Sequence, residues 1–287
     1  MSTTTIISWN INGIRSNILT EPGCKYSARR AKGELLPFHT HPSSNFGQMV
    51  EKHKPDIVCM QETRCDLAVA NSIVDDYFPF RYFHQSTGKG RGRGSGYAGT
   101  AIWARNKPIN VTMGLPTLAV PNEAGRIITL EFDSFYVITV YTPNSGTNED
   151  YRIGEWDPAI KQYLHNLIQT GKNIVFTGDM NVCHHELDIF SGFPPDSIRI
   201  AGLLPEERSA FNQYIEIGLR DPYRELYPDE DEAFTWWNPR IKKFREVNKG
   251  WRIDYTLVSK NIKVHDSQIL TNVFGSDHCP ILLKIET

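Results

Sequence analysis

The sequence predicts an α/β fold in which two mixed β-sheets pack face to face and helices cover the outside. Short apolar runs with the length of strands far outnumber helical patterns, and several follow one another closely enough to form hairpins. Both observations favour this arrangement over a doubly wound parallel sheet. No shift in composition and no internal repeat divides the 287 residues, so we expect a single domain over residues 1–287.

Eight runs rich in apolar and β-branched residues are predicted to be strands. In chain order they are Thr5–Ile11, Asp56–Gln61, Thr100–Trp103, Ile127–Phe132, Phe135–Tyr141, Asn173–Thr177, Arg252–Val258 and Pro280–Ile285. Two polar stretches, Thr20–Ser44 and Gln85–Gly96, are predicted to be loops.

Three segments are predicted to be helices. Asp157 is a suitable N-cap and Pro158 a suitable first residue for a helix whose apolar stripe stops before Gly171. Pro205 begins a second helix with an apolar face, and a third is expected over Phe46–His53.

Composition excludes several classes of protein. Apolar residues make up 40% of the chain and charged residues 22%, which is enough apolar material for a core and excludes wholesale disorder. The net charge of −2 excludes a general basic coat, so an anionic partner must be bound by local patches. No apolar run is long enough to span a membrane, and the first residues do not resemble a secretion signal. We therefore expect an intracellular protein with no membrane association.

The five cysteines are odd in number and widely spaced, which argues against a disulfide framework or a structural zinc site.

Polar residues recur at the ends of the predicted strands. The six groups are Asn10 with Asn12, Gln61 with Glu62, Tyr141 to Asn144, Asp179 with Asn181, Asp254, and Ser276-Asp277-His278. Taken singly, each is explained equally well by a turn, because Asn, Asp and Gly favour turns. Six such ends in one chain indicate one site assembled at the rim of the sheets.

The residues in this set indicate a type of chemistry. Oxygen ligands favour a hard cation such as Mg²⁺. Asp254 is available to orient His278 and keep it cationic, which suits a contact with phosphate. Asp179, close to Asn181, is suited to activate a water molecule. The combination fits hydrolysis of a phosphate ester.

Motifs along nearly the whole chain resemble the exonuclease III family of apurinic/apyrimidinic endonucleases, within the broader endonuclease/exonuclease/phosphatase superfamily. They are SWNING (8–13), QE (61–62), GYAG (96–99), GR (125–126), YTPNSG (141–146), GDMNVCHHELD (178–188), AGLLPEER (201–208), FTWW (234–237), GWRIDY (250–255) and GSDHCP (275–280). QE, GDMN and SDH fit any superfamily member, whereas YTPNSG, AGLLPEER and GWRIDY point to the DNA-repair branch.

The resemblance implies a four-layer α/β sandwich and metal-dependent cleavage of DNA on the 5′ side of an abasic site. Mg²⁺ is the expected cofactor, with Mn²⁺ as a second candidate. Glu62 matches the principal metal ligand, and Asn10, Asn12 and Asp277 complete the metal set. The expected partner is double-stranded DNA with abasic sites or 3′ ends, with some 3′→5′ exonuclease or 3′-end-cleaning activity, and the protein is expected to act as a monomer.

Catalytic roles carry over residue by residue from the same resemblance. Asp179 matches the residue that activates or orients the attacking water. Asn144 and Asn181 match donors to the scissile phosphate. His278, held by Asp254, matches the cationic partner of that phosphate.

Five further residues match positions with supporting roles. Tyr141 matches a phenol that either assists the nucleophile or contacts the phosphate, and Asp188 matches a proposed proton donor to the leaving group. Trp236, Trp251 and Ile253 fall on the apolar pocket for the bare sugar, where Ile253 excludes a normal base by its size.

DNA contacts outside the catalytic centre are also implied. Tyr97 and Arg126 match positions that touch the DNA backbone. The basic segments Asn238–Arg252 and Gln85–Gly96 are expected to follow phosphates rather than to be merely solvated. The chain departs from the family at Ile200, where an asparagine near the catalytic centre is usual.

Two other functions remain open on the sequence alone. One is a superfamily phosphodiesterase acting on a phospholipid or inositol phosphate, against which GWRIDY and YTPNSG count. The other is a protein that binds damaged DNA without cutting it. The intact set of Glu62, Asp179, Asn181 and His278 counts against a pure binder, which needs no metal ligand or general base.

Overall fold

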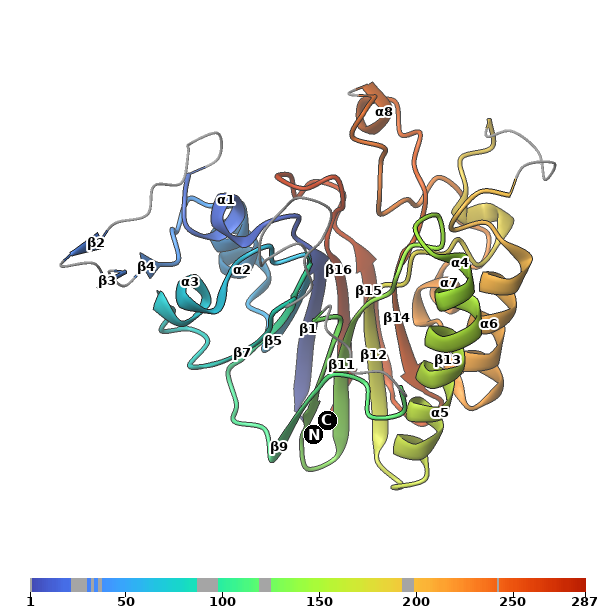
Figure 1. The fold of residues 1–287 in the computed structure, drawn as a ribbon, viewed down its shortest axis with the longest axis horizontal. Coiled ribbons are helices and arrows are strands. Elements are labelled where there is room, and N and C mark those ends of the chain that lie inside the picture. Colours follow the sequence, from blue (N-terminus) through green and yellow to red (C-terminus); the bar gives the residue numbers. More distant parts are fainter. Residues whose placement is uncertain are drawn as a thin grey trace.

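The chain folds into two six-stranded mixed sheets that pack face to face, with helices on both outer faces (Figure 1). The computed structural model describes residues 2–21, 38–86, 98–118, 125–192, 199–241 and 243–287, together with the backbone alone at 30–31 and 34–35. The predicted α/β sandwich is therefore confirmed. The two termini lie together at the end of the sandwich opposite the short helix α8 (Lys243–Glu246).

The first sheet has the strand order β15–β16–β1–β5–β8–β7. Its strands are β15 (Val264–Ile269), β16 (Ile281–Glu286), β1 (Thr3–Asn10), β5 (Ile57–Gln61), β8 (Thr100–Ala104) and β7 (Phe80–His84). Only β1 and β5 are parallel neighbours in this sheet; its other pairs are antiparallel.

The second sheet has the order β13–β14–β12–β11–β10–β9. Its strands are β13 (Leu219–Arg220), β14 (Asp254–Ser259), β12 (Asn173–Asp179), β11 (Phe135–Tyr141), β10 (Ile127–Glu131) and β9 (Asn110–Met113). Here β11 and β12 form the parallel pair. Each sheet thus contains one parallel pair near its centre.

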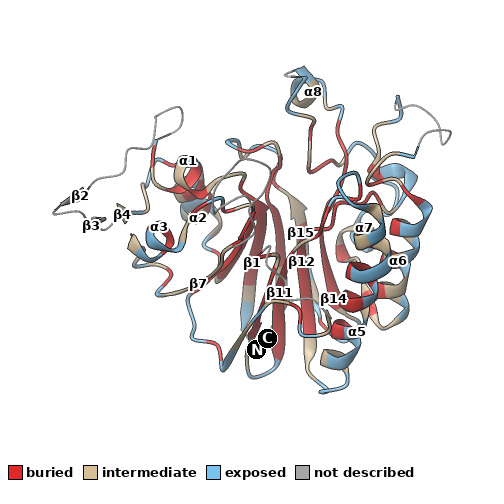
Figure 2. Cartoon of the chain, in the orientation of Figure 1, coloured by how far each residue is buried: buried red, intermediate tan, exposed pale blue. Residues whose placement is uncertain are grey.

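The apolar residues form three layers of core. One cluster lies between the sheets and includes Ile102, Val137 and Leu283. The outer face of the first sheet packs on α1 (Ile14–Ile18), α2 (Asn45–His53) and α3 (Leu67–Ser72), and that of the second on α5 (Asp157–Ile168) and α6 (Pro205–Glu216). Because central strands are covered on both faces, they are buried along most of their length (Figure 2).

Short elements complete the fold. They are β2 (Arg30–Ala31), β3 (Glu34–Leu35), β4 (Phe38–His39), β6 (Ile73–Val74), α4 (Glu149–Tyr151), a π-helix (Arg152–Trp156), a 3₁₀-helix (Glu186–Asp188), α7 (Pro222–Leu226) and α8 (Lys243–Glu246). None of the helices in the described part of the chain is long and apolar enough to cross a membrane. Four cysteines, at 59, 65, 183 and 279, are buried free thiols, as expected, and Cys24 lies outside the described residues.

All three predicted helices form, but the start of one differs from the prediction. Ser44 caps α2 by accepting a hydrogen bond from the Gly47 N–H at 2.9 Å, and Pro205 begins α6. Asp157 is not an N-cap, because the helix continues back through the π-helix and α4 to Asn148. Its carboxylate instead binds Arg152, one turn earlier.

The sequence prediction missed the two-residue strands β2, β3, β4 and β6, which form two small sheets. Within the two six-stranded sheets it missed four strands, and all four lie at sheet edges. They are β7 and β15 in the first sheet and β9 and β13 in the second. Edge strands carry polar or half-exposed residues on the side that meets solvent, so their hydrophobic pattern is weak. The eight predicted strands are confirmed, with ends that shift by one or two residues.

Gly178 has no room for a side chain. It lies in β12 immediately before Asp179, has a φ of 141°, and a Cβ built on it would lie 2.0 Å from the Val140 carbonyl oxygen of β11. We therefore expect Gly178→Ala to lower the free energy of unfolding by at least about 2 kcal/mol, measured by urea denaturation. Gly154→Ala is the control, since a Cβ there meets no atom within 4 Å. Equal stability of the two variants would contradict this packing argument.

Candidate active site

A cavity of about 200 Å³ opens where β1, β5, β11 and β12 end. Because each parallel pair has its carboxyl ends at one edge, the residues that follow these four strands meet there. β14, running the other way, contributes its first residue, and His278 precedes β16. The cavity is lined by Glu62, Tyr141, Asn144, Asp179, Asn181, Ala201, Gly202, Trp236, Trp251, Ile253, Asp277 and His278. A larger cavity of about 730 Å³ lies beside Tyr223, Trp237 and Phe274, but none of the predicted site residues lines it.

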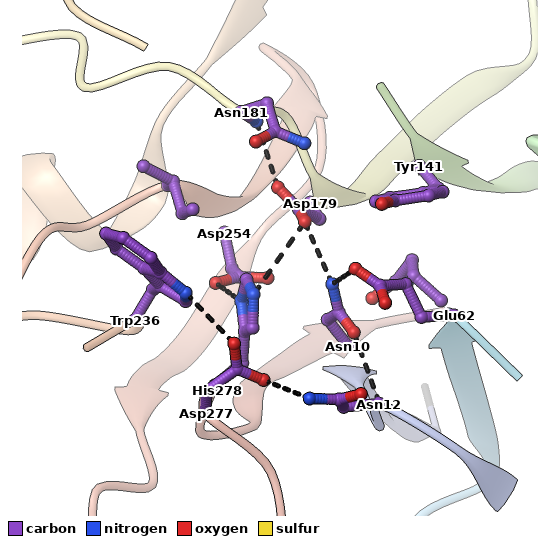
Figure 3. A network of polar contacts seen from close by, with 12 residues as sticks. Asn10, Asn12, Glu62, Tyr141, Asp179, Asn181, Trp236, Asp254, Asp277 and His278 are labelled. Atoms are coloured by element: carbon purple, nitrogen blue, oxygen red, sulfur yellow. Dashed lines mark hydrogen bonds and ion pairs between the residues drawn. The ribbon is translucent and has the colours of Figure 1, made fainter. Parts of the chain in front are cut away.

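His278 is held as a buried cation at this cavity (Figure 3). Its Nδ1–H donates to Asp254 Oδ2 at 2.8 Å, and its Nε2 lies 3.9 Å from Asp179 Oδ2. Burial acts to lower the pKa of His278, but the carboxylates of Asp254, Asp179 and Asp277 outweigh it and raise this pKa to about 10. The ring is therefore an imidazolium at neutral pH.

Asp179 combines burial with a crowded set of charges. Burial raises the pKa of Asp179 to about 7, although the His278 cation acts to lower it. Its Oδ2 accepts a hydrogen bond from Asn10 Nδ2 at 2.9 Å, and its Oδ1 accepts one from the Asn181 N–H at 3.0 Å. A carboxylate that titrates near neutral pH is suited to accept a proton during a reaction.

The asparagines after β1 connect the carboxylates. Asn10 Nδ2 also donates to Glu62 Oε1 at 3.1 Å, so one amide group contacts two acids. Asn12 Nδ2 donates to Asp277 Oδ1 at 2.6 Å, and Trp236 Nε1–H donates to Asp277 Oδ2 at 3.2 Å (Figure 3). Burial acts to raise the pKa of Asp277, but the His278 cation and these donors hold it below its usual value.

Three polar residues of the site have a left-handed backbone. The φ angles are 47° at Asn12, 52° at Glu62 and 48° at Asn181. Each lies one or two residues beyond the end of a strand, where the chain turns sharply. Non-glycine residues rarely adopt this conformation, and such residues cluster at functional sites.

Asn144 and Asn181 form an amide pair on one wall. Asn144 Nδ2 donates to Asn181 Oδ1 at 3.2 Å, and Asn181 Nδ2 donates to the Thr142 carbonyl at 2.9 Å. Each NH₂ group carries two hydrogens, so each retains one N–H for a further acceptor. The pair therefore presents donors toward the cavity that both residues line.

Tyr141 and Arg126 stack beside these groups. The Arg126 guanidinium lies 4.8 Å from the Tyr141 ring centre, and its Nη1 donates to the Tyr141 carbonyl at 3.1 Å. Burial and the nearby Glu62 carboxylate raise the pKa of Tyr141, so the phenol keeps its proton. Arg126 does not line the cavity itself, which leaves it at the rim.

An apolar wall faces the polar groups. The Trp236 and Trp251 ring centres are 5.4 Å apart, and Ile253, which is 5% exposed, completes the wall.

Thr235 was not among the predicted site residues, yet its hydroxyl oxygen accepts hydrogen bonds from the N–H groups of Ile253 and Asp254, both at 3.1 Å. Nothing in the sequence distinguishes this threonine from any other.

Comparisons with known proteins agree with these features. The model of the endonuclease/exonuclease/phosphatase family matches residues 7–278. The chain belongs to this family. It is 35% identical to an exodeoxyribonuclease of Bacillus subtilis over 285 residues, covering 98% of each chain. It is 36% identical to a DNA-(apurinic or apyrimidinic site) endonuclease of Dictyostelium discoideum, covering 98% of this chain and 70% of that one. A solved AP endonuclease of Leishmania major superposes with a TM-score of 0.78 at 27% identity, covering 99% of this chain and 88% of that one.

Members of this family are divalent-metal-dependent hydrolases, and the site offers two sets of ligands. Asp179, Asp254 and His278 have ligand atoms within 4.8 Å of one another. His278 is protonated and bound to Asp254, so its ring has no lone pair for a metal. The oxygen donors of Glu62 and Asp277, supported by the two asparagines, are therefore the set that fits a hard cation.

Asp188 lies outside the cavity, contrary to the role that the resemblance implied. It is buried and accepts hydrogen bonds from Arg224 Nη2 at 2.7 Å and from the Tyr255 hydroxyl at 3.1 Å, with Arg252 Nε 3.0 Å away. Burial acts to raise the pKa of Asp188, but Arg252 and Arg224 hold it below its usual value. An ionised carboxylate between two guanidinium groups has no proton to donate and acts as an anchor for the 181–188 segment.

Tyr97, a predicted DNA contact, lies outside the described residues, as does most of Gln85–Gly96. Ile200 does not line the 200 Å³ cavity but lines an adjacent apolar cavity of about 420 Å³ with Phe190, Trp236 and Trp251. The departure at Ile200 therefore changes the surroundings of the apolar wall rather than the polar centre.

The charge of Asp188 supports the fold above acidic pH. Because its folded-state pKa is the lowered one, its stabilisation is present above about pH 4 and is lost as the pH falls below that value. We expect Asp188→Asn to lower the free energy of unfolding by about 3 kcal/mol at pH 7. The free energy of unfolding of this variant should also decrease less than that of the wild type as the pH is lowered. Urea denaturation between about pH 3 and pH 7 measures both.

The control for this prediction is Asp266→Asn, which removes a surface acid lying 4.0 Å from Lys284. A half-exposed pair of this kind contributes no more than about 1 kcal/mol. If Asp188→Asn is as stable as Asp266→Asn at neutral pH, the anchoring role is wrong.

Proposed function

We propose that the protein is a Mg²⁺-dependent DNA repair nuclease that hydrolyses the phosphodiester on the 5′ side of an abasic site in double-stranded DNA. We propose some 3′→5′ exonuclease or 3′-end-cleaning activity at the same site. Two observations support this proposal best. The His278 cation lies between Asp254 and Asp179, and the Asn144–Asn181 amide pair lines the same cavity. The names of the two relatives above support the choice of substrate.

In this proposal Asp179 activates the attacking water. Its pKa near neutrality lets the ionised carboxylate take a proton as the water oxygen forms a bond to phosphorus. The bond from phosphorus to the 3′ oxygen of the preceding nucleotide then breaks, and this oxygen takes a proton from solvent water to become the free 3′ hydroxyl. His278 stabilises the phosphate through charge, because its imidazolium is fixed in orientation by Asp254.

The amide pair supplies neutral donors to the same phosphate. The free N–H groups of Asn144 and Asn181 are fixed in place by hydrogen bonds to each other and to the main chain. Donors that are already oriented stabilise developing charge without reorganisation. Glu62 and Asp277 would hold Mg²⁺, which neutralises charge on the phosphate and on the leaving oxygen when bound.

The apolar wall supports an abasic substrate. A nucleotide must leave the helix to reach a buried centre, and extrusion costs least where no base is stacked. Trp236, Trp251 and Ile253 suit the bare sugar, since they offer apolar surface and Ile253 leaves little space for a base.

Incision of a defined substrate tests the proposal. We expect nicking of a labelled duplex that contains one abasic-site analogue, with Mg²⁺ present and EDTA absent, and no nicking of the intact duplex. Asp179→Asn should lower kcat by at least about 10³, because the general base is lost along with its charge. Asp266→Asn, on β15, is the matched control and should cut like the wild type.

Other outcomes of this assay would contradict the proposal in distinct ways. Tight binding to the analogue without any cut indicates a protein that recognises damage only. Release of headgroups from phospholipids or of phosphate from inositol phosphates, with no action on DNA, indicates the other branch of the superfamily.

A further inference from the structure

A buried guanidinium lies directly behind the amide pair. Arg152 is 2% exposed and begins the π-helix Arg152–Trp156, which leads into α5. A π-helix closes i to i+5 turns, so its first residue lies above the residue five positions later. This geometry brings Arg152 Nε to 2.8 Å and 3.0 Å from the two carboxylate oxygens of Asp157.

The rest of the guanidinium binds main-chain oxygens of two separate loops. Nη1 donates to the Pro143 carbonyl at 2.9 Å and approaches the Asn181 carbonyl at 3.5 Å. Nη2 donates to the Met180 carbonyl at 3.2 Å. One side chain therefore holds the loop after β11 and the loop after β12 at a fixed separation.

These carbonyls adjoin the two amide donors. Pro143 immediately precedes Asn144, and Met180 immediately precedes Asn181. Asn181 also has the left-handed φ of 48°, a conformation that persists only where surrounding contacts enforce it. Arg152 contacts the Met180 and Asn181 carbonyls, which lie on the two sides of the Asn181 Cα, and these contacts help to hold Asn181 in that conformation.

A second acid extends the same cluster to a third loop. Arg152 Nη1 lies 3.6 Å from Glu207 Oε1. The other oxygen of Glu207 accepts hydrogen bonds from the N–H groups of Gly202 at 2.8 Å and Leu204 at 3.1 Å. Gly202 lines the cavity, so all three loops of this wall are tied to one buried charge cluster.

We propose that Arg152, with Asp157 and Glu207, is the positioning residue that sets the spacing and orientation of the Asn144 and Asn181 amide groups. This inference rests on the proposed function, because it assigns Arg152 to the wall that binds the scissile phosphate. Arg152 does not line the cavity and acts only through the main chain of the two asparagines.

The test compares Arg152→Lys and Arg152→Met with Arg81→Met. Lysine keeps the buried charge opposite Asp157 and Glu207, but its single ammonium lacks the planar fork that reaches both Asp157 oxygens and three main-chain carbonyls. Arg81 on β7 also donates to main-chain carbonyls, those of Asp75 and Phe78, outside the cavity. Steady-state incision of the abasic duplex is measured at a temperature where each variant is folded by circular dichroism.

We expect Arg152→Lys to lower kcat by about 10-fold to 10²-fold with KM for DNA nearly unchanged, because misplaced donors weaken transition-state binding rather than DNA binding. Arg81→Met should keep the wild-type kcat. Combining Arg152→Lys with Asn181→Ala should cost less than the sum of the two single changes, because part of the effect of Arg152 acts through Asn181. A wild-type kcat for Arg152→Lys, or full additivity in the double variant, would overturn the inference.

A measurement without turnover separates this inference from the proposed function. Side-chain amide resonances of Asn144 and Asn181 in ¹⁵N NMR spectra should shift in Arg152→Lys, while those of the buried Asn17, which binds the Ile11 carbonyl at 2.8 Å, should not. Absence of incision by the wild type would reject the proposed function alone. Unshifted Asn144 and Asn181 signals would reject the positioning role alone.

Discussion

The arrangement of the site depends on how its buried carboxylates are balanced by positive charge and hydrogen bonds. Glu62, Asp179, Asp254 and Asp277 lie around one imidazolium, that of His278. Charges this close are tolerated away from bulk water only when they are paired and hydrogen-bonded. The Asn10 amide donates to Glu62 and Asp179, and the Asn12 amide donates to Asp277. Glu62 is also ion-paired with Arg64. Under the proposed function, the oxygens of Glu62 and Asp277 would hold a divalent cation.

The sandwich provides the geometry that this charge balance needs. Two parallel pairs end at the same edge, so strands from both sheets deliver carboxylates to one place. Gln61, buried at the end of β5, joins the sheets beneath the cavity by donating to Ser8 at 3.0 Å and to Thr139 of β11 at 2.8 Å. Slippage of one sheet against the other would break the Gln61–Thr139 hydrogen bond and separate Glu62 from Asp179.

The sequence predicted central strands well because these strands are buried on both faces and read as apolar runs. It predicted the grouping of polar residues at strand ends because such residues have no place inside a sheet. It could not predict interactions that depend on residues meeting in space. Asp157 looked like an N-cap because it precedes a proline, yet it binds Arg152, and the hydrogen bonds of Thr235 leave no mark on the sequence. Edge strands such as β15 were missed because their polar side chains face solvent.

Asp179 and Asp188 carry the same chemical group, but their different surroundings give the two carboxylates different properties. Both are buried carboxylates of the segment GDMNVCHHELD, nine residues apart. Asp188 faces the guanidinium groups of Arg224 and Arg252, and its pKa is held low, so it stays an anion and anchors the chain. Asp179 faces one imidazolium but also Asp254 and Glu62, and its pKa rises to about 7. Acids with separated pKa values in one region are a mark of acid–base chemistry. The acid with the raised pKa lines the cavity, and the acid with the lowered pKa anchors the 181–188 segment that follows β12.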